Sequence, residues 1–100
     1  MSGPLDGFDE VVHAPRRLAI CAFLTTVDEA EFGTIRERLE ISDSSLSKQI
    51  KLLADVGYVS SRKSALRGRS RVWVGLTDAG REAFADHVER LRRVLSSAEN

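Results

Sequence analysis

Two stretches of the chain carry side chains suited to binding a polyanion. The first lies in a predicted helix over residues 43–55, on the side that faces away from its apolar stripe. Its members are Ser44, Ser45, Ser47, Lys48, Gln49 and Lys51. Hydroxyls can approach a groove closely, an amide can bond two atoms of an adenine edge, and lysines neutralise phosphates. This face predicts contact with double-stranded DNA, with Gln49 as the candidate base reader.

The second stretch, residues 62–71, has five cations and no carboxylate. The cations are Arg62, Lys63, Arg67, Arg69 and Arg71. Guanidinium groups suit phosphate oxygens and narrow A·T-rich minor grooves. We therefore expect Arg67 and Arg69, at the tip, to lie beside or in the minor groove, and the sequence leaves both placements open. The alternative is that the polar helix face and the basic run are simply solvated.

The charge distribution supports the binding hypothesis, although the net charge of the 100 residues is zero. Residues 44–76 contain seven Lys or Arg and one Asp or Glu, whereas residues 1–43 contain four and nine. A nucleic-acid interface depends on such a local excess of positive charge rather than on a high total. The balanced total therefore does not exclude a DNA-binding protein.

The spacing of apolar residues predicts three helices ahead of the basic run. The first covers residues 15–27, because proline is favourable in the first turn of a helix. The second ends near Glu40, after apolar residues at spacings of three and four. The third, over residues 43–55, follows a connection of about three residues, in which Ser42 or Asp43 can cap it. Two short helices joined by a tight turn are thus expected.

Two strands and a long helix are expected after this pair. Residues 58–61 and 72–76 have strand-like composition and are expected to pair as a hairpin, with residues 62–71 as an exposed loop. Trp73 is expected to pack against the hairpin or the last helix, with a contact near the sugar-phosphate chain as the alternative. Thr77 can cap a last helix over residues 77–96.

The order of these elements predicts a mainly α (α+β) fold: a winged helix-turn-helix with a two-stranded β-hairpin wing and a long C-terminal helix. We expect a single domain over residues 1–100, with residues 1–7 as a loose leader and residues 8–13 as a short turn of helix. In this fold the helix over residues 43–55 would enter the major groove.

The last helix also predicts a homodimer. Phe84, Val88, Leu91 and Leu95 are spaced four, three and four, as in a coiled-coil seam. One hundred residues could hardly cover this stripe without a partner, and Leu18 in the helix over residues 15–27 is expected to join the interface. The alternative is that the stripe packs against the helix over residues 15–27 within one chain.

Other functional classes find little support. Cys21 lies in an apolar run and is expected in the core, and His13 and His87 are expected as surface or interface residues without metal-ligand spacing. We do not expect an enzyme, because the sequence shows no recognisable arrangement of a nucleophile, a base and an orienting group. We also expect no bound metal or cofactor. With no signal peptide and no apolar run of 18 residues, we expect a cytoplasmic protein that does not enter a membrane.

Five pieces of the sequence, in order, resemble small winged-helix transcriptional regulators of the MarR/ArsR-like superfamily. They are His13 to Ile20, Phe32 to Ile35, Leu46 to Ile50, Gly57 to Val59 and Leu76 to Arg81. The resemblance covers about residues 8–95 and implies a homodimer that binds a pseudo-palindromic operator and usually represses. Gln49 stands where many relatives have histidine, so their base preference does not carry over.

Together these patterns predict a sequence-specific regulator that binds double-stranded DNA as a homodimeric repressor. Residues 43–55 are expected in the major groove and residues 62–71 on the backbone or minor groove. The alternative is a winged-helix module that binds an acidic protein partner. Whether a small-molecule effector exists is left open; it would have to lodge at the dimer interface.

Overall fold

The computed structural model describes residues 7–98, with Leu66 described by its backbone only. The elements are α1 (Glu10–His13), α2 (Pro15–Leu24), β1 (Ala30–Glu31), α3 (Phe32–Leu39), α4 (Asp43–Asp55), β2 (Val59–Leu66), β3 (Arg69–Leu76) and α5 (Asp78–Ala98). The three strands form one antiparallel sheet in the order β1-β3-β2. This is a mainly helical fold with a small sheet and a long last helix, as the sequence predicts.

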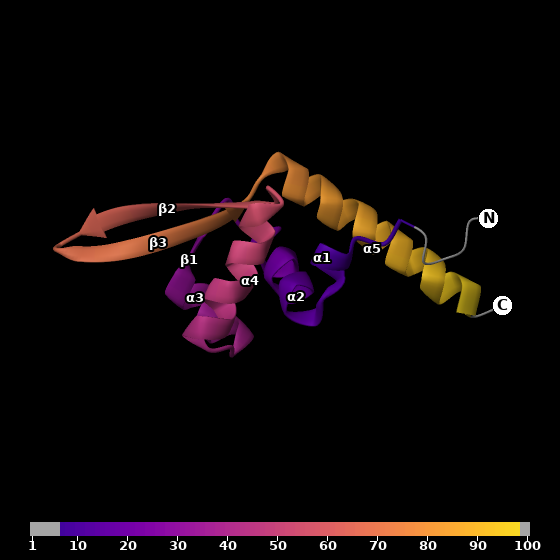
Figure 1. Ribbon diagram of the computed structural model, residues 1–100, viewed down its shortest axis with the longest axis horizontal. Coiled ribbons are helices and arrows are strands. Elements are labelled where there is room, and N and C mark those ends of the chain that lie inside the picture. The colour runs from indigo at the N-terminus through magenta and orange to yellow at the C-terminus, as the bar shows by residue number, and fades with distance from the viewer. Residues whose placement is uncertain (1–6, 99–100) are drawn as a thin grey trace.

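The molecule is elongated, with extents of 57 × 24 × 21 Å. Figure 1 shows the β2–β3 hairpin projecting from one end of a helical body, while α5 runs away toward the other end. We call residues 59–76, the two strands and their turn, the wing. The helices α2, α3 and α4 gather below the base of the wing (Figure 1). Residues 1–6 of the expected leader lie outside the described residues.

The core lies where α2, α3 and α4 meet the base of the sheet. Ile20, Leu24, Ile35, Leu46 and Leu53 are fully buried there, together with Cys21. Burial raises the pKa of the Cys21 thiol to about 11, so this side chain behaves as a small apolar group. The prediction of Cys21 as a core residue is confirmed.

The first helices are shorter than the sequence predicts. The turn of helix expected over residues 8–13 is present as α1, and the Asp9 carboxylate caps it by accepting hydrogen bonds from the backbone of Val11 and Val12. Helix α2 ends at Leu24, not at residue 27. The hydroxyls of Thr25 and Thr26 bond the carbonyls three residues earlier, and the chain turns away there.

Strand β1 is absent from the sequence-based expectation. The sequence indicates only that Asp28 and Glu29 lie near the start of the next helix, but Ala30 and Glu31 pair with Val74 and Trp73 of β3. The chain passes so close to β3 that a Cβ on Gly75 would lie 2.5 Å from the Asp28 carbonyl oxygen. Glycine at this position therefore allows the segment before β1 to approach the wing.

Helix α4 has the predicted bounds and the predicted cap. The Ser42 hydroxyl accepts a hydrogen bond of 3.1 Å from the backbone of Ser45, which satisfies one donor at the helix start. Beyond the helix, Gly57 adopts a left-handed backbone with φ of 81°. Both signals are local, which is why they could be read from the sequence.

The expectation of a ten-residue loop over residues 62–71 is wrong. The strands continue to Leu66 and resume at Arg69, so that Leu66 pairs with Arg69 across a two-residue turn. Both turn residues have positive φ, 52° at Arg67 and 77° at Gly68, as the tight turns favoured in hairpins require. The outer wing has no core to face, so it lacks the apolar alternation that marks a strand.

Helix α5 begins where predicted and runs two residues further. The Thr77 hydroxyl caps it by accepting a hydrogen bond of 3.0 Å from the backbone of Gly80. Its 21 residues give a length of about 31 Å. In the described part of the chain no helix combines the length and apolar character needed to cross a membrane.

Candidate nucleic-acid interface

The exposed face of α4 is a narrow polar stripe. It consists of Ser44, Ser47, Lys48 and Lys51, all exposed. Spacings of three, four and seven residues place these side chains on one side of the helix. The opposite side buries Leu46 and Leu53. This face can offer hydroxyl and ammonium donors to phosphates and base edges.

Two of the six predicted α4 residues, Gln49 and Ser45, do not lie on this exposed face, so their expected exposure is wrong. Gln49 is only 8% exposed, and its Oε1 accepts a hydrogen bond of 2.8 Å from Arg17 of α2. The hydroxyl of Ser45, one turn earlier, is buried without a hydrogen-bond partner among the described residues. Gln49 lies about 60° around the helix from Leu46, and α2 packs over that flank.

Carboxylates restrain the cations at both ends of α4. Arg36 of α3 forms an ion pair of 2.7 Å with Asp43, and this contact raises the pKa of Arg36. Lys51 lies 3.1 Å from Asp55 on the exposed surface. Within residues 7–98, Lys48 has no ion-pair partner, so it is the α4 cation most available to a phosphate.

At the base of the wing, Arg62 is held by a carboxylate and an aromatic ring. Its Nε lies 3.0 Å from both carboxylate oxygens of Glu29, a second guanidinium nitrogen also bonds this carboxylate, and the hydrogen bond lowers the pKa of Glu29. The guanidinium also lies over the Trp73 ring, 5.4 Å from its centre. Trp73 in turn donates a 3.0 Å hydrogen bond to Ser64, so it packs within the hairpin.

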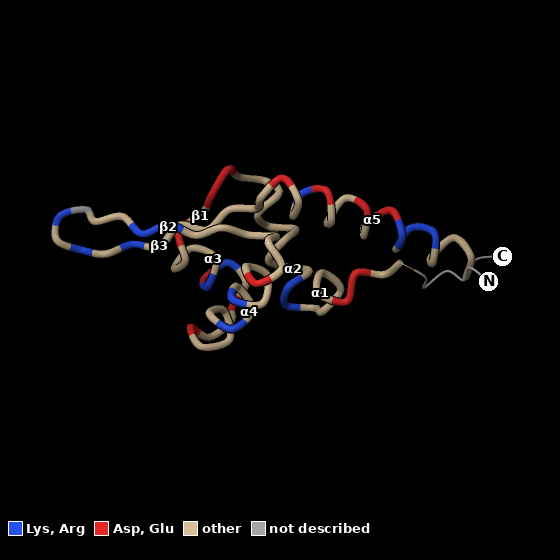
Figure 2. The backbone as a smooth tube through the Cα atoms, turned by 45° about the horizontal axis from the view of Figure 1, so that its top comes forward, with Lys and Arg blue, Asp and Glu red and all other residues tan. Residues whose placement is uncertain are grey.

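The cations of the wing therefore form two groups. Arg71 pairs with Glu31 at 2.9 Å, just as Arg62 pairs with Glu29. Lys63, Arg67 and Arg69 are exposed and, in the part of the chain that the structure describes, form no ion pair. Figure 2 shows Lys and Arg at the end of the wing, far from the acidic residues spread along α5. We call these three residues, Lys63 midway along β2 and Arg67 and Arg69 at the turn, the wing-tip cations.

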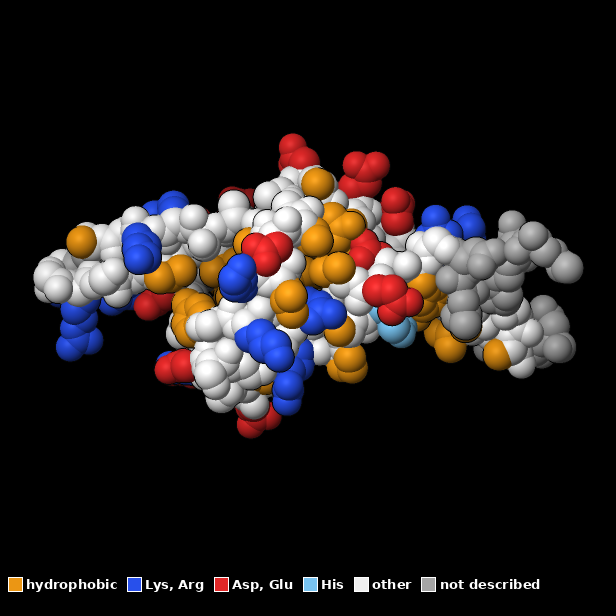
Figure 3. Space-filling model, in the orientation of Figure 1, with side chains coloured by type: hydrophobic (Ala, Val, Ile, Leu, Met, Phe, Trp, Pro, Cys, Tyr) orange, Lys and Arg blue, Asp and Glu red, His pale blue; other side chains and the backbone are white. Residues whose placement is uncertain are grey.

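The two basic regions lie on an otherwise mixed surface. In Figure 3 the Lys and Arg side chains gather on the wing and on the lower centre of the molecule, where some Asp and Glu lie among them, and a further group of Asp and Glu lies at the upper centre. A protein with zero net charge thus still presents positively charged surface on α4 and on the wing. This separation of charge is what an electrostatic approach to DNA requires.

Residues 16–95 match the family described as winged helix DNA-binding domain. The chain belongs to this family. It has the family and fold of DNA-binding transcriptional regulators, not of enzymes, and the resemblance to small winged-helix transcriptional regulators is confirmed.

Individual proteins are similar to this chain over most of their length. An uncharacterized protein of Methanocaldococcus jannaschii is 29% identical over 83 residues, covering 83% of this chain and 90% of the relative. A transcriptional regulator homologue from Pyrococcus horikoshii is 26% identical with a TM-score of 0.86, covering 97% of this chain and 94% of that one. HlyU from Vibrio cholerae is 29% identical with a TM-score of 0.67, covering 82% and 84%.

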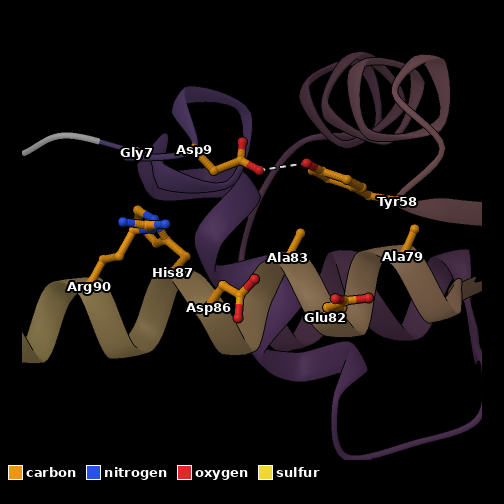
Figure 4. Close-up of a pocket in the computed structure, with 9 residues that line it drawn as sticks. All are labelled: Gly7, Asp9, Tyr58, Ala79, Glu82, Ala83, Asp86, His87 and Arg90. Carbon is orange, nitrogen blue, oxygen red and sulfur yellow. Dashed lines mark hydrogen bonds between the residues drawn. The ribbon is translucent and has the colours of Figure 1, made fainter.

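A pocket of about 280 Å³ lies between the start of α1, the first half of α5 and Tyr58, which follows α4. Figure 4 shows Asp9 and Tyr58 meeting above α5, where the Tyr58 hydroxyl donates a hydrogen bond of 2.6 Å to the Asp9 carboxylate. This bond raises the pKa of Tyr58 to about 12. No group of three His, Cys, Asp or Glu side chains in residues 7–98 is placed to hold a metal ion.

The two histidines meet, although they are 74 residues apart in sequence. His13 Nδ1 lies 3.0 Å from His87 Nε2, and the Phe8 ring packs edge-on against both imidazoles. His87 is only 1% exposed within the single chain, so the expectation of a surface or interface residue is wrong for His87, whereas His13 is exposed. The contact joins α1 to α5, and sequence spacing could not reveal a pair made by tertiary packing.

The predicted dimer residues differ in how far the protomer covers them. Phe84 packs against the core, and Leu18, Val88 and Leu91 are half-buried. Leu95 is 65% exposed near the end of α5. The alternative, in which the stripe packs within one chain, therefore accounts for the first part of the stripe but leaves its last turns open.

Proposed function

We propose that this chain is a sequence-specific transcriptional regulator that binds double-stranded DNA as a homodimer and represses by occupying a pseudo-palindromic operator. Helix α4 enters the major groove with its polar stripe, and the wing-tip cations contact the backbone or the minor groove. In this proposal Lys48 and Lys51 neutralise phosphates, and the hydroxyls of Ser44 and Ser47 face the groove.

The observation that carries the proposal is the division of the wing cations. Arg62 and Arg71 are neutralised by carboxylates, but the three wing-tip cations extend from the body without ion pairs among the described residues. Like charges held close together on a hairpin cost free energy unless a polyanion offsets them. The nearby α4 stripe adds a second contact of the same sign.

The proposal revises the role of Gln49 and of the paired arginines. Gln49 already bonds Arg17 and lies below the surface of α4, so it is not a base reader in this arrangement. Arg62 and Arg71 shape the base of the wing through Glu29 and Glu31. Base reading then depends on the short hydroxyls of Ser44 and Ser47, which favours readout of a few base pairs per half-site.

Selection of bound sequences from random duplex DNA tests the proposal. We expect enrichment of an inverted repeat whose half-sites lie about one helical turn, about 34 Å, apart. Affinity for the selected site should then fall steeply with salt. The five cations of each protomer, Lys48, Lys51 and the three wing-tip cations, make ten per dimer and predict a slope of about −9 in log affinity against log salt concentration.

Other results would contradict the proposal. Enrichment of unpaired half-sites would refute the two-fold dimer on DNA. A slope near zero, or no enrichment at all, would favour the alternative in which the basic wing binds an acidic protein partner. Arg69→Ala should weaken binding to every sequence, whereas Arg71→Ala, which removes a paired cation, should change the slope much less.

The dimer part of the proposal rests on the last turns of α5. Leu95 is a large apolar side chain exposed on a helix that extends beyond the body (Figure 1). Two copies of α5, each contributing half-buried Val88 and Leu91 as well, would bury this stripe. Leu18 of α2 is half-buried and is proposed at the edge of the same interface.

Sedimentation of two variants tests the interface. Leu95→Glu places a charge in the proposed contact and should shift the protein toward the monomer, while Arg92→Glu changes an exposed charged side chain on the same helix and serves as the control. An unchanged dimer in Leu95→Glu would move the interface away from the end of α5. Because Leu95 lies outside the core, the variant should fold normally.

A further inference from the structure

Arg17, in the first turn of α2, bridges α1 and α4. Its Nε donates a hydrogen bond of 2.6 Å to the carbonyl of Val11, and its Nη1 donates one of 2.8 Å to Gln49 Oε1. A guanidinium is a rigid planar fork, so two bonds in different directions fix both partners relative to each other. The neighbouring Arg16 is exposed and, among the residues that the structure describes, forms no such bridge.

The sequence explains why Arg17 bonds Val11. In a helix, the carbonyl of Val11 would accept a hydrogen bond from residue 15, four positions later. Residue 15 is proline, which has no backbone N–H, and α1 ends at His13. The carbonyl is therefore left without its usual donor, and the Arg17 side chain supplies one. Pro15 and Arg17 thus act together to close α1 against α2.

Gln49 is the matching half of the bridge. It lies in the middle of α4 and is 8% exposed, so its amide oxygen depends on the protein for a hydrogen bond. Removing the partner of a buried polar group costs the desolvation of that group, whereas removing both partners costs much less. Arg17 and Gln49 are therefore expected to act as one unit.

Helix α1 is in turn fixed to α5 and to the end of α4. His13 contacts His87 of α5 at 3.0 Å, and Asp9 accepts the hydrogen bond from Tyr58, three residues beyond α4 (Figure 4). The middle of α4 is held through Arg17 and its far end through Tyr58. Both connections lead through α1 to the helix proposed to form the dimer.

We propose that Arg17 is a positioning residue that sets the angle of α4 relative to α5, and through it the half-site spacing that the dimer accepts. This inference rests on the proposed function. Helix α4 has 13 residues and is about 20 Å long, so a tilt of about 10° about its Tyr58 end moves its first residues by about 3 Å. That displacement equals the rise of about one base pair.

The test compares three methionine variants on DNA. Arg17→Met and Gln49→Met each remove one half of the bridge at similar volume, and Arg16→Met removes an equal charge from the same turn. Their affinities are measured for the selected operator and for versions with one base pair added or removed between the half-sites. The wild-type protein should discriminate against the altered spacings.

We expect Arg17→Met and Gln49→Met to reduce this discrimination by about threefold to tenfold, and the double variant to be no worse than either single one. Arg16→Met should leave the discrimination unchanged. The salt slope of Arg17→Met should match wild type, because a positioning residue releases no counterion. Unchanged spacing discrimination, or a slope smaller by about one per protomer, would overturn the proposal; the latter would assign Arg17 to phosphate contact.

A measurement without DNA separates this inference from the proposed function. Spin labels at Lys48→Cys on α4 and Arg92→Cys on α5 report the distance between the helices, since Cys21 is buried and unreactive; dilution with unlabelled protein keeps the signal within one protomer. We expect the distance distribution to broaden with Arg17→Met but not with Arg16→Met. If the distribution broadens but the protein binds no DNA in the separate titrations, Arg17 is a positioning residue and the proposed function is refuted. An unchanged distribution would refute the positioning role.

Discussion

Single residues of the wing turn show a conflict between stability and the proposed contact. Arg67 has φ of 52°, a left-handed backbone that costs an ordinary side chain about 1 kcal/mol, and asparagine commonly takes this place ahead of glycine in a hairpin turn. An exposed arginine in a conformation that it does not favour, in the turn of a basic hairpin, is consistent with a binding role.

Replacing Arg67 by Asn tests this conflict. We expect the free energy of unfolding to rise by about 0.5 kcal/mol, because Asn tolerates the left-handed conformation better, while DNA affinity falls. Chemical denaturation and titration of the operator measure the two effects. Arg69→Asn, on a strand with ordinary φ, should lower affinity without the gain in stability. Unchanged affinity in Arg67→Asn would place the turn away from DNA.

The residue scale also shows what a sequence pattern can and cannot reveal. The types of side chain on α4 and the wing were predictable, because helix periodicity and local charge depend on neighbouring residues alone. The inward position of Gln49 was not, because Arg17 lies 32 residues away and reaches it only once α2 packs on α4. The same holds for His13 and His87.

At the scale of elements, strand β1 controls how much charge the wing presents. Glu29, next to β1, and Glu31 within it hold Arg62 and Arg71, and β1 pairs with β3 alongside them. Sequence patterns located α4 well because its cap, apolar stripe and terminal glycine are local signals. They missed β1 because two residues carry no periodicity, and they missed the outer wing because its pairing partners are its own polar strands.

Releasing Arg62 from its carboxylate should strengthen DNA binding. Glu29→Gln removes the ion pair at the base of the wing while keeping the shape of the side chain, and Arg62 can then turn to a phosphate. We expect higher affinity for random duplex DNA and a salt slope steeper by about 0.9 per protomer, measured by titration at several salt concentrations. Glu37→Gln, an equal change of net charge on α3, is the control. Equal effects of both variants would mean that net charge alone is responsible.

At the scale of the whole molecule, α1 connects the helical body to α5 through a contact that depends on protonation. His87 is 1% exposed, and its Nδ1 has no hydrogen-bond partner in residues 7–98. Burial lowers the pKa of His87, and the nearby His13 lowers it further. Asp9 has an opposing, raising effect on this pKa, and Arg90 adds a smaller lowering effect. Two fully protonated imidazoles could not keep a nitrogen-to-nitrogen contact, because neither ring would have an acceptor left.

The resulting prediction is a loss of stability in mild acid. Because the pKa of His87 is lower in the folded chain than the ordinary value of 6.5, the unfolded chain binds the proton more tightly between those two values. The contribution of neutral His87 to the free energy of unfolding is therefore fully present above pH 6.5. It is lost as the pH falls from 6.5 through the lowered pKa. Urea unfolding of the wild type at several pH values between 7 and 5 should show this decrease, and His87→Gln should show a smaller one even if it is less stable throughout. Parallel pH profiles for the two proteins would assign the acid sensitivity to other groups. A decrease confined to the wild type would mean that the contact between His13 of α1 and His87 of α5 weakens as acidity rises.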